Sequence, residues 1–121
     1  MFYYFIINPS SSSGKHKTLW REIKEQLEKE EINYKIAATK KTGDAKRLAR
    51  EASLQVSETN PCTIVAIGGD GTVNEVVNGL ILSPFLSFGY IPTGSGNDLA
   101  RGLGLSKEPL EALAFILHPK E

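Results

Sequence analysis

The sequence is poor in cysteine, in net charge and in long hydrophobic runs, and each shortage excludes a class of protein. The one cysteine, Cys62, cannot form an intramolecular disulfide and fits a reducing compartment. Fourteen basic residues balance fourteen acidic ones, so net charge gives no support for a nucleic-acid partner. No apolar run approaches the roughly 20 residues of a membrane span, and segment 2–7 is too short for a signal peptide. We expect a cytoplasmic protein with a single domain over residues 1–121.

Short apolar segments alternate with longer amphipathic ones along the chain. Residues 2–7, 34–38, 63–67 and 86–91 are apolar and rich in β-branched or aromatic side chains, which favours buried strands. Apolar residues at helical spacing predict helices over 17–30, 45–56, 99–103 and 110–117, and another from residue 73. Strands that alternate with helices are typical of a parallel sheet covered on both faces. The expected fold class is α/β, a three-layer αβα domain with a mostly parallel sheet.

The helical stripes also predict which side chains are buried. The stripe after the glycine turn consists of Val73, Val76, Val77 and Leu80. The last stripe consists of Leu110, Leu113, Ala114 and Leu117. Thr72 and Glu75 have the spacing of a capping box, so we expect them to close the first turn of the helix that follows the glycines.

The turn Gly68-Gly69-Asp70-Gly71 stands between the third apolar segment and a helix. One interpretation is an ordinary tight turn of an α/β domain. The other is a phosphate site, because glycines let a ligand approach the backbone and a helix N-terminus presents free N–H groups. Asp70 has no evident structural reason to stand between glycines, and this favours the second interpretation.

Polar turns follow all four predicted strands. They are the segment 8–15, the turn around Thr39, the turn 68–72 and the segment 93–98. Parallel strands end at one edge of their sheet, where ligands of open α/β sheets bind. The serine run 10–13 with Gly14 and Lys15 fits either a flexible linker or a phosphate-binding loop, although it lacks the Walker A spacing. The convergence of the turns predicts a nucleotide site.

Four segments resemble the diacylglycerol kinase catalytic family, which also includes sphingosine kinases and bacterial lipid kinases. The first is the segment 68–76, Gly-Gly-Asp-Gly-Thr-Val-Asn-Glu-Val, whose first four residues are shared with NAD kinases. The second is the segment 92–101, which resembles the family pattern Pro-x-Gly-Thr/Ser-x-Asn-Asp-x-Ala-Arg. The third is Thr39 with Gly43-Asp44-Ala45. Segment 8–15 resembles the family's first nucleotide loop, with Ser12 where glycine is usual.

The resemblance implies an NAD kinase/diacylglycerol kinase-like N-terminal domain that binds ATP with Mg²⁺. It implies Asp70 as the catalytic acid, which either orients the acceptor hydroxyl or holds Mg²⁺, and no other metal ligand is assigned. The nucleotide contacts that it implies are Asn8, Pro9, Ser10, Ser11, Ser12, Thr39, Gly69, Asp70, Gly71, Thr72, Val73, Asn74, Glu75 and Ser95. The candidates for substrate contact are Asn97, Asp98 and Arg101.

The resemblance implies phosphorylation of diacylglycerol or a related lipid hydroxyl at a membrane surface. Family enzymes carry a second, β-rich domain, so we expect this chain to be the nucleotide-binding domain of a longer kinase and inactive alone. A peripheral position at the inner membrane face and a homodimer both stay open. Two rival functions also stay open: an NAD kinase-like enzyme, and a non-catalytic nucleotide-binding or regulatory module.

Overall fold

The computed structural model describes residues 1–9, 16–93 and 108–119. Four strands and four helices alternate in these ranges, which confirms the α/β fold class. In chain order they are β1 (Phe2–Ile7), α1 (His16–Lys29), β2 (Asn33–Ala38), α2 (Asp44–Leu54), β3 (Cys62–Gly68), α3 (Asp70–Gly79), β4 (Leu86–Pro92) and α5 (Pro109–Leu117). The helix predicted over residues 99–103 lies outside the described residues.

The strands form one parallel sheet in the order β2-β1-β3-β4. The two inner strands, β1 and β3, contain the most continuous apolar runs, and every residue of β3 is buried. This matches the rule that strands covered on both faces read as unbroken apolar segments. Ile7 pairs with Ala38 on one side and with Ile67 on the other, so three strands end level with one another.

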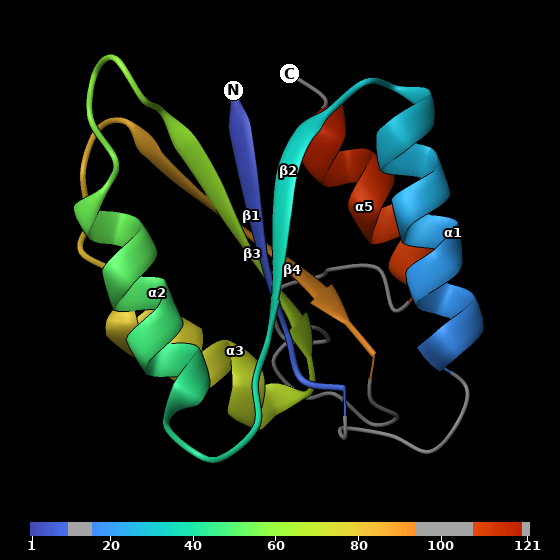
Figure 1. Cartoon of the computed structure of the whole chain (residues 1–121), viewed down its shortest axis with the longest axis horizontal. Coiled ribbons are helices and arrows are strands. Elements are labelled where there is room, and N and C mark those ends of the chain that lie inside the picture. Colours follow the sequence, from blue (N-terminus) through green and yellow to red (C-terminus); the bar gives the residue numbers. More distant parts are fainter. Residues whose placement is uncertain (10–15, 94–107, 120–121) are drawn as a thin grey trace.

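Helices cover both faces of the sheet and make three layers. Figure 1 shows α2 and α3 on one face and α1 and α5 on the other. Side chains that alternate along the strands supply two separate cores, with Ile6 and Ile64 facing α2 and α3, and Phe5 and Val65 facing the other pair. None of the helices in the described part of the chain is both long and apolar enough to cross a bilayer.

In α3 and α5, the buried face of the helix differs from the apolar stripe predicted from the sequence. Val77 is 48% exposed, whereas Thr72 and Gly79 are buried together with Val73 and Val76. Small residues face inward here because α3 approaches the backbone of α2 closely, and hydrophobicity alone does not signal such an approach. In α5 the exposed alanine is Ala114 and the buried one is Ala112, since Leu113, Ile116 and Leu117 set the inward face.

The predicted capping box at the start of α3 is wrong. The helix begins at Asp70, so Thr72 lies within its first turn and the N-cap is Gly69, which makes no side-chain capping hydrogen bond. The carboxylate of Glu75 accepts a hydrogen bond from the backbone N–H of Gly43 instead. Within the residues that the structure describes, no side chain caps the N-terminus of α3.

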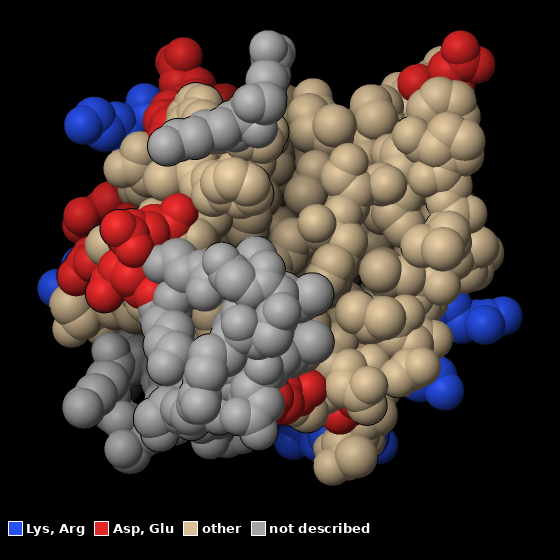
Figure 2. Space-filling model, turned by 180° about the vertical axis from the view of Figure 1, so that it is seen from behind, with Lys and Arg blue, Asp and Glu red and all other residues tan. Residues whose placement is uncertain are grey.

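Seen from behind, the side of the molecule that carries β4 is largely without charged side chains (Figure 2). Large apolar side chains between residues 77 and 88 are exposed, namely Val77, Ile81, Leu82, Phe85 and Phe88. Among the described strands β4 is the edge strand on this side. An exposed apolar patch next to an open strand edge is typical of a surface that another protein segment covers.

Gly79 allows α2 and α3 to pack closely. A Cβ atom placed on Gly79 would lie 2.2 Å from the backbone oxygen of Lys46 and 3.1 Å from Cβ of Ala49. The backbone of α2 cannot move away as a flexible side chain could. The contact between the two helices therefore depends on the missing side chain.

We predict that Gly79→Ala lowers the free energy of unfolding by about 1–3 kcal/mol, the usual cost of overpacking. The matched control is Gly71→Ala, also in α3, where an added Cβ meets nothing within 4 Å. This control should be neutral or gain up to about 1 kcal/mol from better helix propensity. Urea unfolding of the three proteins measures both effects, and equal loss in the two variants would contradict the packing argument.

Candidate nucleotide site

The carboxyl ends of the four strands bring distant segments into one row. The N–H of Thr39 donates to the Ile7 oxygen at 2.8 Å, and that of Asn8 to the Ile67 oxygen at 3.2 Å. On the other side of β3, the N–H of Thr93 donates to the Gly68 oxygen at 3.0 Å. The row thus runs from the residue after β2 to the residue after β4, as expected for a site at the edge of a parallel sheet.

The three glycines of the turn differ in what surrounds the position where a Cβ atom would stand. A Cβ on Gly68 would lie 2.7 Å from Oγ1 and 2.9 Å from Cβ of Thr72, so Gly68 is required for the close approach of the Thr72 side chain. Gly69 and Gly71 meet nothing within 4 Å at the Cβ position. The turn is therefore tightly packed on its inner side and open above Gly69 and Gly71, where a ligand could approach the backbone.

The N-terminus of α3 faces this open space. The first bond along the helix runs from the N–H of Val73 to the Gly69 oxygen, at 3.2 Å. The N–H groups of the preceding turn have no partner within the helix, and they carry the positive end of its dipole. Asp70, the first residue of α3, is exposed, and no described residue bonds its carboxylate. Backbone donors and one carboxylate are thus available together.

Side chains of the predicted motif are divided between this opening and the core. Thr72 is 6% and Val73 is 1% exposed, so these two residues can reach a ligand only through the backbone. Asn74 is exposed, and its oxygens accept from Nδ2 of Asn78, one turn later. Glu75 is directed to Gly43, at 2.8 Å between Oε1 and N. Asp70 is thus the exposed side chain of the motif at the opening itself.

The loop between β2 and α2 joins the site through Thr39. Oδ2 of Asp44 accepts hydrogen bonds from the N–H groups of Lys40 at 2.8 Å and Lys41 at 3.1 Å. The Lys40 N–H bond in particular, with the Lys41 N–H bond and the nearby Arg47 guanidinium, holds the pKa of the Asp44 carboxyl below its ordinary value. In the sequence, Asp44 stands out only as part of the Gly-Asp-Ala motif. The signal for its role was its place as the first residue of a helix after a polar turn.

Thr93 is a further candidate, which the motifs of the sequence do not indicate. Its Oγ1 is buried and has no hydrogen-bond partner within residues 1–9, 16–93 and 108–119. Buried hydroxyls are normally paired, so an unpaired one at a candidate site marks a place for a ligand contact. The signal was positional, since Thr93 is the first polar residue after β4, as Asn8 and Thr39 are after β1 and β2.

The structure brings several of the predicted site residues that it describes to one edge of the sheet. Asn8 and Thr39 are neighbours in the row of strand ends, Pro9 follows Asn8 and is exposed, and Gly69 and Gly71 belong to the turn. The remaining predicted residues lie outside the described residues. These are Ser10, Ser11, Ser12, Ser95, Asn97, Asp98 and Arg101.

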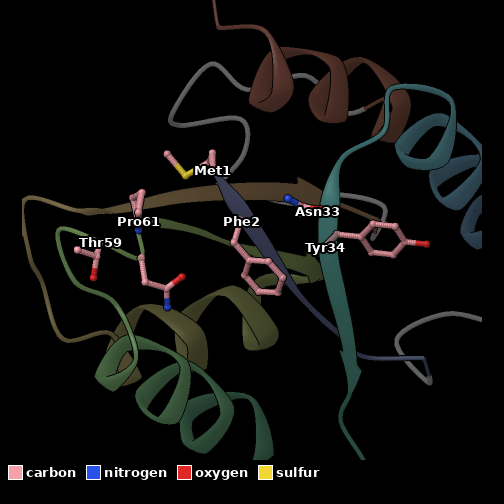
Figure 3. Close-up of a pocket in the computed structure, with 7 residues that line it drawn as sticks. Met1, Phe2, Asn33, Tyr34, Thr59 and Pro61 are labelled. Atoms are coloured by element: carbon pink, nitrogen blue, oxygen red, sulfur yellow. The ribbon is translucent and has the colours of Figure 1, made fainter.

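A hollow of about 410 Å³ opens at the other end of the sheet. Figure 3 shows it at the amino ends of the strands, with Met1, Phe2, Thr59 and Pro61 around it, whereas the Tyr34 ring points away toward α1. It contains none of the predicted site residues. The glycine turn lies at the opposite edge of the sheet, where the strands have their carboxyl ends. It is an open surface site and is separate from this hollow.

The residues present fit a phosphate group better than a metal held by the protein alone. The open space above Gly69 and Gly71 and the free N–H groups suit a phosphate. In the described ranges no three His, Cys, Asp or Glu side chains gather closely enough to hold a metal ion. Mg²⁺ is commonly held by one or two carboxylates together with substrate phosphates, and Asp70 can supply one such carboxylate.

The glycine turn, the helix N-terminus and the row of strand ends together define an α/β domain with a parallel sheet and a candidate site at its carboxyl edge. Residues 3–121 match the family model described as "Diacylglycerol kinase catalytic domain", and the chain belongs to this family. It is 39% identical over 106 residues to a diacylglycerol kinase of Bacillus subtilis, a match that covers 87% of this chain and 34% of the relative. It is 37% identical over 113 residues to a diacylglycerol kinase of Staphylococcus saprophyticus, which covers 93% and 36%.

Solved structures agree with this assignment. A crystal structure of a diacylglycerol kinase from Bacillus anthracis superimposes with a TM-score of 0.77 at 33% identity, and the match covers 94% of this chain and 42% of that one. This likeness confirms the expected three-layer fold. The chain spans about a third of the length of the two bacterial relatives named above.

We predict that Asp44→Asn destabilises the protein at neutral pH and that the difference from the wild type disappears in acid. The folded pKa of Asp44 is depressed, so its contribution is present above the ordinary Asp pKa and is lost as the pH falls through the folded value. Below that value the wild-type side chain is itself neutral. Melting temperatures of both proteins between pH 7 and pH 2 measure the difference, and a gap that persists at the lowest pH would contradict the argument.

Proposed function

We propose that this chain is the nucleotide-binding domain of an ATP-dependent lipid kinase, which phosphorylates diacylglycerol or a related lipid hydroxyl. The observation that carries the proposal is the glycine turn, which is open above Gly69 and Gly71 and lies at the N-terminus of α3 beside the exposed Asp70. The family match over residues 3–121 favours this activity over that of an NAD kinase, which shares the Gly-Gly-Asp-Gly segment and the fold. Named lipid kinases among the relatives support it further.

The backbone of the turn supplies the binding groups. Backbone N–H groups at the N-terminus of α3 would donate hydrogen bonds to the oxygens of the nucleotide phosphates, and the glycines leave room for these phosphates. Bound Mg²⁺ supplies charge neutralisation on those phosphates. Phosphoryl transfer depends mostly on positioning and on charge stabilisation, so a fixed backbone site suits it. Asp70 would either orient the acceptor hydroxyl or hold Mg²⁺, and both roles need its negative charge.

The complete enzyme would contain a second, β-rich domain that forms the other wall of the site. The greater length of the relatives supports this part of the proposal, and so does the exposed apolar patch beside β4. The lipid would be met at a membrane surface, with the enzyme peripheral at the inner face. We propose no nucleic-acid partner, because the charges of the chain balance.

Mg·ATP should bind the isolated chain weakly, because the second wall of the site is missing. In an NMR titration we expect the largest amide shifts at Asn8, Thr39, Gly69 and Gly71, which the strand ends and the glycine turn bring together. The amides of Phe2 and Thr59, beside the hollow at the amino ends of the strands, serve as the internal control and should not shift. Shifts confined to that hollow, or none at millimolar Mg·ATP, would argue against the proposed nucleotide site.

In the complete kinase, Asp70→Asn should lower the rate of lipid phosphorylation by ~10²-fold or more, the scale of one positioned acid–base group. Asn preserves the shape of the side chain and tolerates turn conformations, so the fold should be unchanged. Turnover and melting temperature are measured on the same preparation. Glu58→Gln, which removes an exposed carboxylate in the loop before β3, is the matched control and should keep full turnover. Near-normal turnover of Asp70→Asn would show that phosphoryl transfer does not need the negative charge of Asp70.

A further inference from the structure

The loop of residues 39–43, between β2 and α2, is anchored to the sheet at its first residue. The N–H of Thr39 bonds to the oxygen of Ile7, and this extends the pairing of β2 with β1 by one residue. Asp44 then fixes the next two peptide groups through the N–H groups of Lys40 and Lys41. Asp44 is 7% exposed, so these bonds are shielded from competing water. The first half of the loop is therefore held locally.

The second half of the loop is held from a different part of the chain. The N–H of Gly43 donates to Oε1 of Glu75 at 2.8 Å, across 32 residues of sequence. Gly43 adopts a φ of +94°, a left-handed conformation that favours glycine, and it is also the N-cap of α2. Hydrogen bonds to a carboxylate are stronger than those between neutral groups. Glu75 therefore ties the Thr39 loop to α3, the helix whose N-terminus opens at the glycine turn.

Glu75 is poorly placed to act on the same ligand group as Asp70. The two residues are five positions apart in α3, which turns their side chains about 140° from each other and separates them by about 7.5 Å along the axis. Asp70 has no partner among the described residues, whereas Glu75 already bonds Gly43. These two facts assign different tasks to the two carboxylates of the motif.

We propose that Glu75 is a positioning residue, which holds the Thr39 loop in place through the N–H of Gly43 instead of contacting the nucleotide. The inference rests on the proposed nucleotide site and adds a mechanical link between two of its loops. With the link intact, Mg·ATP at the glycine turn meets a Thr39 loop that is already ordered. Without the link, binding must also order the loop, and affinity falls.

The test compares Glu75→Ala with Glu75→Gln in this chain. The glutamine oxygen can still accept from Gly43, so a positioning role survives in Glu75→Gln, whereas a role that needs the negative charge does not. We expect the Kd for Mg·ATP, from NMR titration, to rise about tenfold in Glu75→Ala and to stay within about twofold of the wild type in Glu75→Gln. The control is Glu51→Ala, which removes an exposed acid of α2 that pairs with Arg47.

Amide hydrogen exchange of Gly43 provides a readout that needs no nucleotide. It should accelerate about tenfold or more in Glu75→Ala and stay near the wild-type rate in Glu75→Gln and Glu51→Ala. Equal weakening of Mg·ATP binding in both Glu75 variants, with Gly43 still protected in Glu75→Gln, would overturn the inference in favour of a charge contact. Normal binding by Glu75→Ala would also overturn it. Absence of binding by the wild-type chain would instead refute the proposed nucleotide site, and Gly43 exchange would still decide whether Glu75 holds the loop.

Discussion

The level ending of the parallel strands is the constraint on which the site depends. Because Ile7 stands opposite both Ala38 and Ile67, the residues that follow three strands begin their turns at one height. The backbone bonds from Thr39, Asn8 and Thr93 to neighbouring strands then fix those turns relative to one another. A shift of one residue in any pairing would turn core side chains to the wrong face. The buried sheet therefore sets the geometry of the site as well as its stability.

The glycine turn illustrates what the sequence can predict and what it cannot. Three glycines around an acid predict an exposed turn for a ligand, and the open space at Gly69 and Gly71 agrees with this prediction. The sequence does not distinguish Gly68 from the other two glycines. In the structure, Gly68 is needed because a Cβ atom there would collide with the side chain of Thr72. That difference arises from the course of the chain through the turn, which brings the side chain of Thr72 back over Gly68.

Strands and fold class could be predicted because continuous apolar segments have few alternatives in a chain of this length. Helix faces were predicted less well, since Val77 was expected on the buried stripe of α3 and is exposed, whereas Gly79 is buried. The approach of α3 to Lys46 decides this, and it is a contact between segments that no local spacing encodes. The tie between Gly43 and Glu75 was missed for the same reason, because the two residues are 32 positions apart.

Three acidic residues near the carboxyl edge of the sheet have carboxylates in three different settings. Asp44 is surrounded by backbone N–H groups, which hold its pKa low and keep it ionised for a local structural task. Glu75 bonds one peptide group of the neighbouring loop and so links two elements. Asp70 is exposed at the helix N-terminus and has no bond to any described residue. A carboxylate that accepts a backbone hydrogen bond is held in position by it, although its other lone pairs remain available. Of these three, Asp70 is therefore the one that no described residue holds, whereas Asp44 and Glu75 are both tied to the loop between β2 and α2.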